Sequence, residues 1–293
     1  MSRDYKIILA VAAVVLAAMC VSFFRPSTYN FIGDYYRERG DMEKSEAFYG
    51  ISAESGDRDG QFAMSVFAAE RKDYGKAREW SEKAADQGLP EAMYNMGVYC
   101  IAAKAENVDE AALDEAMKWF RRASSAGFAK ADYSLGMCYD EKSEKFDRGK
   151  AASHKASAFR CFERAAGRGY EKASLEVAGR LLYGDGTPKD EKRAFELFKA
   201  ASDGGDRHGR YYEAFCLSEG LGVDADRGRA LQIVRDLLKS PPSSGSPSSP
   251  ELEEMISALE KKLSRSDKES GAESSGSGGS DTAGSAGSGV DKT

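Results

Sequence analysis

The sequence predicts an all-α protein, an α-solenoid of about six stacked helix-turn-helix repeats, and three observations favour this fold. A register that begins with glycine returns five times, a pattern of small and aromatic residues precedes each return, and proline is scarce between Pro26 and Pro241. Helix pairs of this kind bury their apolar faces only by stacking on their neighbours. The chain lacks the alternating apolar pattern of β-strands, which argues against a β-rich fold.

In this register the glycine is followed by a small residue four positions on, a bulky residue six positions on and another small residue nine positions on. The clearest copies are Gly88-Ala92-Tyr94-Gly97 and Gly127-Ala131-Tyr133-Gly136. Weaker copies start at Gly56, Gly169 and Gly205. We expect each first helix to close at a small residue, namely Gly33, Ser65, Gly97, Gly136, Ala178 and Ala214. Their spacing predicts six helix pairs between about residues 28 and 240.

The second pattern places a small residue eleven positions before the glycine and, in most copies, an aromatic residue seven positions before it. The sets are Ser45/Tyr49/Ser52, Ala77/Trp80/Ala84, Ala116/Phe120/Ala123, Ala158/Phe162/Ala165 and Ala194/Phe198/Ala201. Spacings of three, four and seven place these residues on one stripe of a helix. Alanine lets neighbouring helices approach, the ring fills the space between them, and the glycine that follows suits the left-handed geometry at a helix C-terminus.

Five segments carry a resemblance to a known family. They are Ala-Met-Tyr-Asn-Met-Gly at 92–97, Ala-Asp-Tyr-Ser-Leu-Gly at 131–136, Ala-Ala-Asp-Gln-Gly at 84–88, and the Gly-x-Gly loops at 184–190 and 220–226. The chain resembles the Sel-one-like repeats, a branch of the tetratricopeptide-like helical repeats, over roughly 70% of its length. The resemblance implies a right-handed solenoid whose first helices line a concave groove, and the Gly-x-Gly segments are similar to the family's loop between the two helices of a pair.

The N-terminus predicts membrane attachment. Residues 7–24 form an unbroken apolar run of 18 residues, preceded by Arg3 and Lys6 and followed by Arg25. As a helix the run reaches about 27 Å, close to the roughly 30 Å of a bilayer core. We expect residues 1–25 to be a signal anchor or transmembrane helix, because the apolar run continues past every plausible cleavage site. A cleaved signal peptide and a lipoprotein acylated at Cys20 are the alternatives.

The orientation of this segment is open on the sequence alone. More basic residues follow the span than precede it, namely Arg25, Arg37, Arg39 and Lys44. By the positive-inside rule this count places the repeats in the cytoplasm. The short basic start is instead typical of an export signal. We favour a single-pass membrane protein with extracytoplasmic repeats, periplasmic if the source is bacterial, and the alternative is secretion after cleavage.

The sequence gives no sign of a catalytic, metal or cofactor site. Neither His154 nor His208 has a Cys, Asp or Glu at a metal-ligand spacing, and both are expected in solvent-facing loops. The net charge of −6 argues against nucleic acid as a partner. The cysteines in the repeat register are expected to be small buried hydrophobic residues. A single disulfide between Cys138 and Cys161 within the fourth pair is the alternative that the sequence leaves open. We therefore expect no metal, no cofactor and no enzymatic activity.

The candidate partner-binding residues are the bulky residues that stand three positions before the small residues. They are Phe62, Tyr94, Tyr133 and Tyr211, with Leu175 in the fifth pair. A ladder of tyrosines offers rigid apolar area and a hydroxyl, which suits capture of a peptide or helix. The alternative is that these rings only pack between successive repeats. An insertion at about 140–156 is locally basic and is either a contact loop for an acidic partner or lipid headgroup, or a solvated charge run.

After the solenoid, assigned to residues 26–240, the composition changes. Residues 241–250 form a Pro/Ser linker, 251–264 a short amphipathic helix that caps the solenoid or docks on a partner, and 265–293 a disordered Ser/Gly-rich tail. The predicted function is a membrane-anchored, non-enzymatic adaptor or scaffold that binds a protein or peptide in its concave groove. The alternatives are an exported enzyme or cell-wall ligand binder using the same groove, and an architectural anchor whose tail carries the interaction.

Overall fold

The computed structural model describes residues 25–102, 108–239 and 250–276. Within these ranges the chain forms thirteen α-helices, two short helical turns and no strand. It divides into two compact units. The first runs to Val177 and also holds Asp185–Thr187, and the second comprises Ala178–Gly184 and the chain from Pro188 onward. The expected all-α repeat fold is therefore confirmed.

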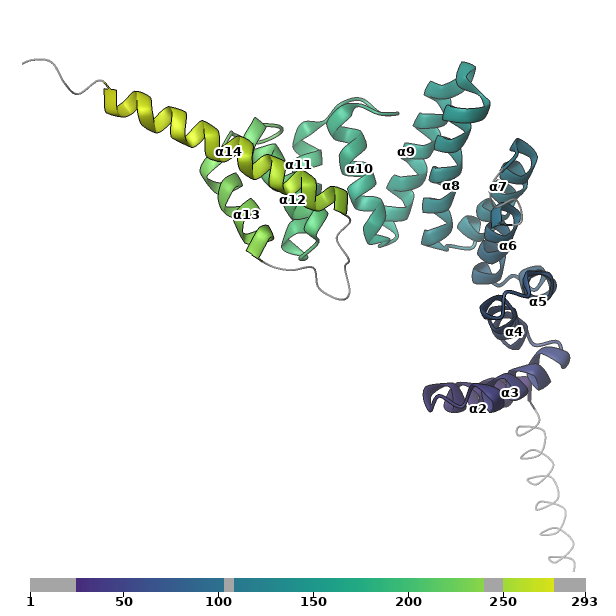
Figure 1. Ribbon diagram of the computed structural model, residues 1–293. Coiled ribbons are helices and arrows are strands. Elements are labelled where there is room, and N and C mark those ends of the chain that lie inside the picture. The colour runs from purple at the N-terminus through teal and green to yellow at the C-terminus, as the bar shows by residue number, and fades with distance from the viewer. Residues whose placement is uncertain (1–24, 103–107, 240–249, 277–293) are drawn as a thin grey trace, which may run out of the picture. The chain divides into compact units, whose positions relative to one another are not determined.

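The first unit contains four complete helix pairs. These are α2 Pro26–Glu38 with α3 Met42–Glu54, α4 Arg58–Glu70 with α5 Tyr74–Asp86, α6 Pro90–Ala102 with α7 Glu110–Ser125, and α8 Ala129–Glu141 with α9 Ala151–Gly167. Each helix from α2 to α8 packs against the next one along the chain (Figure 1). The core of this unit is a chain of contacts between neighbours, as expected for a solenoid.

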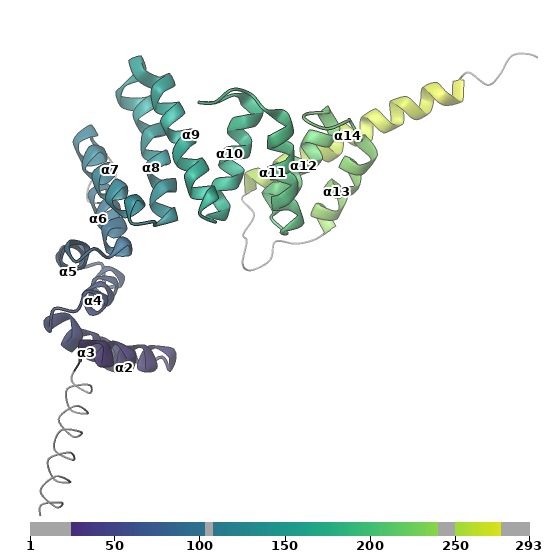
Figure 2. The same ribbon diagram turned by 180° about the vertical axis from the view of Figure 1, so that it is seen from behind.

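The second unit completes the repeat series. The helix α10 Glu171–Tyr183 contributes to both units, and α11 Glu191–Asp203, α12 Arg207–Glu219 and α13 Arg227–Lys239 follow it. Six consecutive pairs thus run from Pro26 to Lys239, close to the predicted limits. The last helix, α14 Pro250–Gly276, lies across α12 and α13 (Figures 1 and 2).

Aspartate begins many of these helices. The residue before the helix accepts a backbone N–H bond from its first turn at Asp41, Asp57, Asp73, Asp109, Asp190, Asp206 and Asp226. Such a carboxylate satisfies an orphan donor and interacts favourably with the helix dipole. At the other end, the glycines of the sequence register have φ between 83° and 91°. This left-handed geometry after the second helices confirms the predicted role of those glycines.

The small residues of the first helices lie near the middle of each helix, so the prediction that they close it is wrong. The helix α6 continues from Gly97 to Ala102, and α8 continues from Gly136 to Glu141. A Cβ atom on Gly97 would lie 2.6 Å from Cε1 of Phe120, and one on Gly136 would lie 2.7 Å from Cε1 of Phe162. The small residue therefore receives the ring of the second helix, which explains why both patterns recur together.

Trp80 does not occupy the ring position of the second pair. Its side chain is half-buried, and the ammonium group of Lys83 lies 4.1 Å from its ring centroid. The fully buried position on α5 belongs to the next residue, Ser81. The assignment of Trp80 to the packing stripe is thus wrong, because the stripe passes one residue further along the helix.

Each Gly-x-Gly loop packs against the N-terminal part of the second helix of the preceding pair. In the 220–226 loop, a Cβ on Gly222 would lie 2.1 Å from the carbonyl oxygen of Glu191 at the start of α11. In the 184–190 loop, a Cβ on Gly186 would lie 2.3 Å from the carbonyl oxygen of Lys155 in α9. Only glycine tolerates such close approach of two backbones, and both glycines also have positive φ.

The helix α14 caps the end of the second unit. Its apolar stripe, Leu252, Ile256, Leu259 and Leu263, is buried against a cluster formed by α12 and α13. Arg207 on α12 forms an ion pair with Glu253 at 2.7 Å, and Lys262 forms one with Glu219 at 2.7 Å. The helix runs past its predicted end at residue 264 to Gly276. Extending a helix that is already anchored by packing costs little, which accounts for the longer element.

The predicted membrane helix at residues 7–24 lies outside the described residues. Among the helices from Pro26 to Gly276, none combines the length and the apolar character that a membrane crossing requires. The predicted linker and most of the predicted tail also fall outside the described part of the chain.

Candidate partner-binding surface

The four ladder residues differ in their burial. Phe62, Tyr94 and Tyr133 are half-buried, whereas Tyr211 is only 7% exposed. Tyr211 belongs to the apolar cluster that α14 covers, so a partner cannot reach its ring while α14 is docked. The remaining three residues lie on α4, α6 and α8, which are first helices of successive pairs.

Tyr94 and Tyr133 both pack on the aromatic residue of their own pair and on one from the turn before the next first helix. The Tyr94 ring lies 5.4 Å from Phe120 and 5.4 Å from Phe128. The Tyr133 ring lies 5.2 Å from both Phe162 and Tyr170. These contacts establish a packing role for the ladder, and the part of each side chain that is still exposed is the part open to a ligand.

A mainly apolar groove opens between α6 and α8. It has a volume of about 440 Å³, and α7 forms its floor. Val98 and Ile101 line it from α6, and Met137 and Cys138 line it from α8. The Met137 side chain is 47% exposed. A flexible thioether beside branched aliphatic side chains can adapt to apolar groups of different shapes.

The helical spacing explains how this groove forms. On α8 its lining residues are Ser134, Met137, Cys138 and Glu141, which follow one face of the helix at intervals of three and four. Val98 and Met137 each follow the small mid-helix glycine directly, so they occupy the same position in successive repeats. Sequence reasoning missed them because it assigned the helix end to this point. Tyr94 and Tyr133 lie one turn before Val98 and Met137.

A second, smaller groove lies between α2 and α4 in the same unit. Its volume is about 210 Å³, and Phe62 and Val66 line it from α4. Unlike the groove between α6 and α8, it is rich in charge, with Asp34 and Arg37 on α2 and Asp59 on α4. Phe62 thus lines a groove whose neighbouring side chains include ionic ones, and its role in partner binding stays a prediction.

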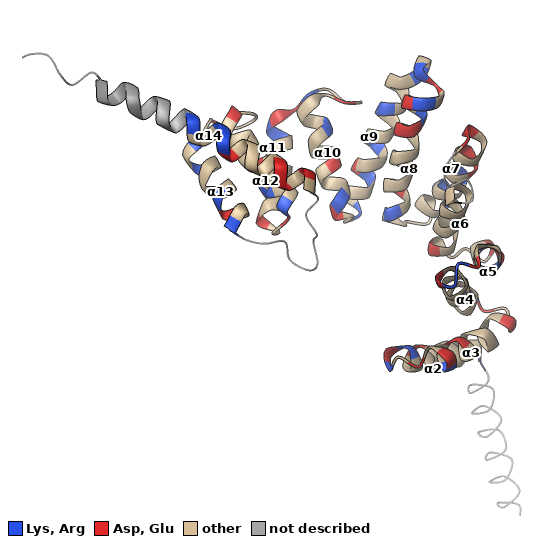
Figure 3. Cartoon of the chain, in the orientation of Figure 1, with Lys and Arg blue, Asp and Glu red and all other residues tan. Residues whose placement is uncertain are grey.

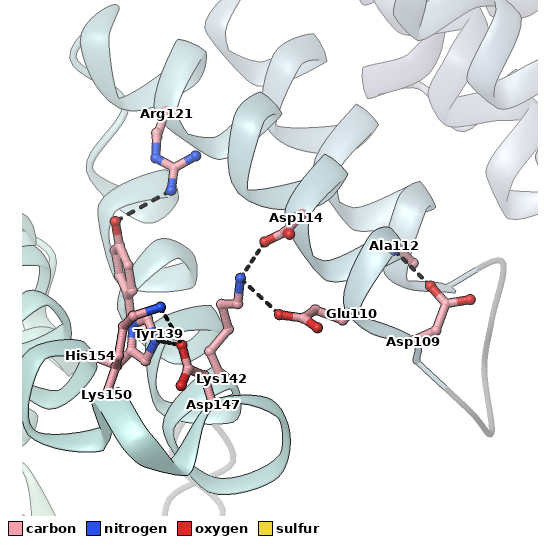
Figure 4. Close-up of polar contacts among 10 residues, drawn as sticks. All are labelled: Asp109, Glu110, Ala112, Asp114, Arg121, Tyr139, Lys142, Asp147, Lys150 and His154. Atoms are coloured by element: carbon pink, nitrogen blue, oxygen red, sulfur yellow. Dashed lines mark hydrogen bonds and ion pairs between the residues drawn. The ribbon is translucent and has the colours of Figure 1, made fainter.

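The basic insertion of the fourth pair is folded and its lysines form ion pairs. It forms a π-helical turn, Lys142–Phe146, and a 3-10 turn, Arg148–Lys150. Lys142 bonds to Asp114 at 2.6 Å and lies 3.4 Å from Glu110, and the hydrogen bond with Asp114 raises the pKa of the lysine (Figure 4). Its other lysines pair with Glu141, Asp147 and Asp185. Ion pairs with nearby carboxylates therefore hold the four lysines of the insertion, and Arg148 donates to the Glu144 carbonyl at 3.1 Å.

His154 lies on α9 and stacks on Tyr139, with a ring separation of 6.1 Å (Figure 4). Its side chain is 16% exposed, so the expectation of a solvent-facing loop histidine is wrong. The end of the insertion, from Ala151 onward, forms the first part of α9, and this places the His154 ring against Tyr139 on α8. Within the described ranges, no group of three or more His, Cys, Asp or Glu side chains is arranged to hold a metal ion.

The cysteines of the described chain are free thiols, and Cys138 and Cys161 are both buried. Burial raises the pKa of Cys138 to about 12 and also raises the pKa of Cys161. A thiol that stays protonated at neutral pH is a poor nucleophile. These two residues therefore act as small apolar groups of the core.

Comparison with known proteins identifies the repeat. The model of the Sel1 repeat matches residues 60–89, 90–128, 147–170, 172–206 and 209–233, which together make up just over half of the chain. A Sel1 repeat protein from Oxalobacter formigenes has a similar structure, with a TM-score of 0.59 and 22% identity over 76% of this chain and 88% of that one. A protective antigen of uropathogenic Escherichia coli strains, which displays an SLR fold, matches at 20% identity and a TM-score of 0.44, over 91% of this chain and 67% of that one. At 22% identity the likeness to the Oxalobacter formigenes protein concerns the fold.

Proposed function

The chain belongs to the Sel1 repeat family, and we propose that it is a scaffold that binds an apolar segment of a protein partner in the groove between α6 and α8. Sel1 repeat proteins are generally protein-interaction scaffolds and are typically not enzymes. The partner site extends along the first helices to the half-buried ladder residues Phe62, Tyr94 and Tyr133. Tyr211 is left out of this site because α14 covers it.

The single observation that carries the proposal is the apolar lining of the groove. Val98, Ile101 and Met137 present aliphatic and thioether groups beside a space of about 440 Å³. Apolar surface in a concave site gains free energy when a partner removes it from water, at about 25 cal/mol per Å². Tyr94 and Tyr133 add aromatic area one turn away on the same two helices, and aromatic residues are enriched among residues that dominate binding energy.

We further propose that residues 7–24 tether this scaffold to a membrane, with the repeats on the extracytoplasmic side. The support is the unbroken apolar run and the short basic segment before it. The expected result is that the full-length protein stays with the membrane pellet after carbonate extraction, and that protease added outside the cell or spheroplast degrades the repeats. A soluble mature species that begins after Met19 or Cys20 would contradict the tether.

The groove is tested by photo-crosslinking in cells. A photoreactive amino acid replaces Met137 in the full-length protein, and the matched control carries it at Leu238 on α13, which is 46% exposed and lies outside both grooves. We expect a discrete protein adduct from position 137 that is absent at position 238. The substitution Met137→Asp should leave helical content unchanged and lower recovery of the same partner at least tenfold. Equal adducts at both positions, or undiminished recovery with Met137→Asp, would rule out the groove.

A further inference from the structure

Another site, distinct from the two grooves, lies on the side of α8 away from the apolar groove. Here α7 and α9 form a cavity of about 500 Å³ that is rich in arginine. Arg121 lines it from α7, Arg160 and Arg164 line it from α9, and Arg168 lines it from the position directly after α9. Hydroxyl groups of Ser124, Ser125, Ser157 and Tyr139 complete its polar wall. All of these residues belong to the first unit.

A buried carboxylate fixes two of the four arginines. Asp132 on α8 is fully buried, and its two oxygens accept bonds from Nε of Arg164 and from Arg168. Ser124 Oγ also donates to Asp132 at 2.6 Å, and Arg168 bonds to the Ser124 carbonyl at 2.9 Å. The two guanidinium groups are thus held at the cavity wall, with side chains that remain 43% and 33% exposed. Arginine has five donors, so each group keeps donors for another anion.

The repeat fold does not need this charged arrangement. Asp132 is the fourth residue of its helix, and the corresponding residues of the other first helices are Tyr29, Gln61, Met93, Ser174 and Arg210. In the second pair, Gln61 and Gln87 stand where Asp132 and Arg168 stand in the fourth. Gln87 donates to Gln61 at 2.8 Å and to the carbonyl of Gly56 at 2.9 Å. Neutral amides therefore make the same bridge elsewhere in this chain, and the charge of the fourth pair calls for another reason.

The other two arginines bond to neutral groups. Arg121 lies 3.3 Å from the Tyr139 hydroxyl (Figure 4), and Arg160 lies 3.1 Å from Ser157 Oγ. Four guanidinium groups thus share one cavity with a single buried carboxylate. Acidic and basic residues are otherwise interspersed along the helices (Figure 3). An anion placed between the arginines would relieve their mutual repulsion and gain charge-assisted hydrogen bonds.

We propose that this arginine pocket binds anionic groups, carboxylate or phosphoryl, on an acidic peptide segment of the protein partner. The inference rests on the proposed scaffold role and names the chemistry of a second contact. The planar arginine fork matches both oxyanions, and clusters of arginine are a recurrent way to bind acidic or phosphorylated segments. The apolar groove and the arginine pocket flank α8 on two sides, so one partner could occupy both with an apolar and an acidic segment.

The test measures peptide binding by fluorescence anisotropy, with the full-length protein in a neutral detergent at low ionic strength. The probes are labelled hexaglutamate, the same peptide with two phosphoserines, and hexaglutamine as the uncharged comparison. The pocket variant is Arg121→Gln with Arg160→Gln, which leaves the Asp132 network intact. Its matched control is Arg78→Gln with Lys172→Gln, which removes the same charge at two exposed positions outside the cavity.

We expect the wild type and the control to bind hexaglutamate equally, the pocket variant to bind it at least tenfold more weakly, and hexaglutamine not to bind. Tighter binding of the phosphoserine peptide, with competition by inorganic phosphate, assigns the pocket to phosphoryl groups, and equal or weaker binding assigns it to carboxylates. Failure of both acidic probes to bind the wild type, or equal weakening in both variants, would overturn the proposal. If the acidic probes fail but the photoreactive residue at position 137 still gives its specific protein adduct, the scaffold proposal stands without the pocket. If that adduct does not form either, both proposals fail.

Discussion

The close contact between Gly136 and Phe162 makes the effect of one added methyl group predictable in sign. An alanine in the middle of a helix is normally more stable than glycine by about 0.5 to 1 kcal/mol. At position 136 the new Cβ would lie 2.7 Å from Cε1 and 2.7 Å from Cζ of Phe162, whose ring is fully buried. Overpacking of this kind costs about 1 to 3 kcal/mol. Gly136→Ala should therefore destabilise the protein by about 0.5 to 2 kcal/mol.

The matched control is Gly179→Ala on α10, because a Cβ at this position meets no atom within 4 Å. It should stabilise the protein by about 0.5 to 1 kcal/mol. The background Phe162→Leu removes Cε1 and Cζ, so Gly136→Ala should become neutral or stabilising there. The coupling free energy between positions 136 and 162 is then about 2 kcal/mol.

Urea unfolding of the four combinations, followed by circular dichroism, measures these differences, and hydrogen exchange locates them on α8 and α9. A stabilising effect of Gly136→Ala in the wild-type background would refute the account of the glycine as a receptor for the ring. So would a destabilisation that stays the same with Phe162→Leu, because the clash would then have another source.

Three further predictions concern the buried acid, the capping helix and the thiols. Asp132→Ala should lower the free energy of unfolding by about 1 to 3 kcal/mol, measured by urea unfolding, because Ser124 loses its acceptor and two arginines lose their counter-ion. Ile256→Asp, at a fully buried position of α14, should release that helix and raise hydrogen exchange in α13, whereas Met255→Asp, 38% exposed, should not. The folded-state pKa of Cys138 is raised to about 12 from an ordinary value of 9.0, so its contribution to stability is present below pH 9.0 and is lost as pH rises towards 12. Alkylation at pH 8, mapped by mass spectrometry, should accordingly label half-buried Cys100 before Cys138, and equal labelling in the folded protein would contradict the burial of Cys138.

The repeat architecture is predictable from this sequence because one physical contact leaves two marks in it. The ring of the second helix needs a residue without a side chain opposite it, and Phe120 with Gly97 and Phe162 with Gly136 repeat this pair of requirements. The position of the helix ends is not contained in that contact. It depends on the turn residues further along, such as Gly40 and Lys72, which take positive φ after α2 and α4.

The candidate surfaces are less predictable, because they depend on residues distant in sequence. Asp132 and its partners Arg164 and Arg168 are 32 and 36 positions apart, and no short motif joins them. Met137 is an apolar residue of the kind expected in a core, and its position in the groove between α6 and α8 leaves it 47% exposed. The ladder residues were found because they belong to the repeat register, and for the same reason most of their surface serves packing.

The second pair shows that the repeats are not independent units. Its ring position holds Ser81, its small position holds Ser65, and both are fully buried. Tyr99 on α6 places its hydroxyl beside both serines, and burial raises the pKa of this phenol. In the first pair, where Tyr49 supplies the ring, the residue that corresponds to Tyr99 is Phe67, which packs on that ring at 6.1 Å. Tyr99 of the third pair therefore supplies the aromatic group that the second pair lacks. The core of the second pair is complete only when α6 packs against it.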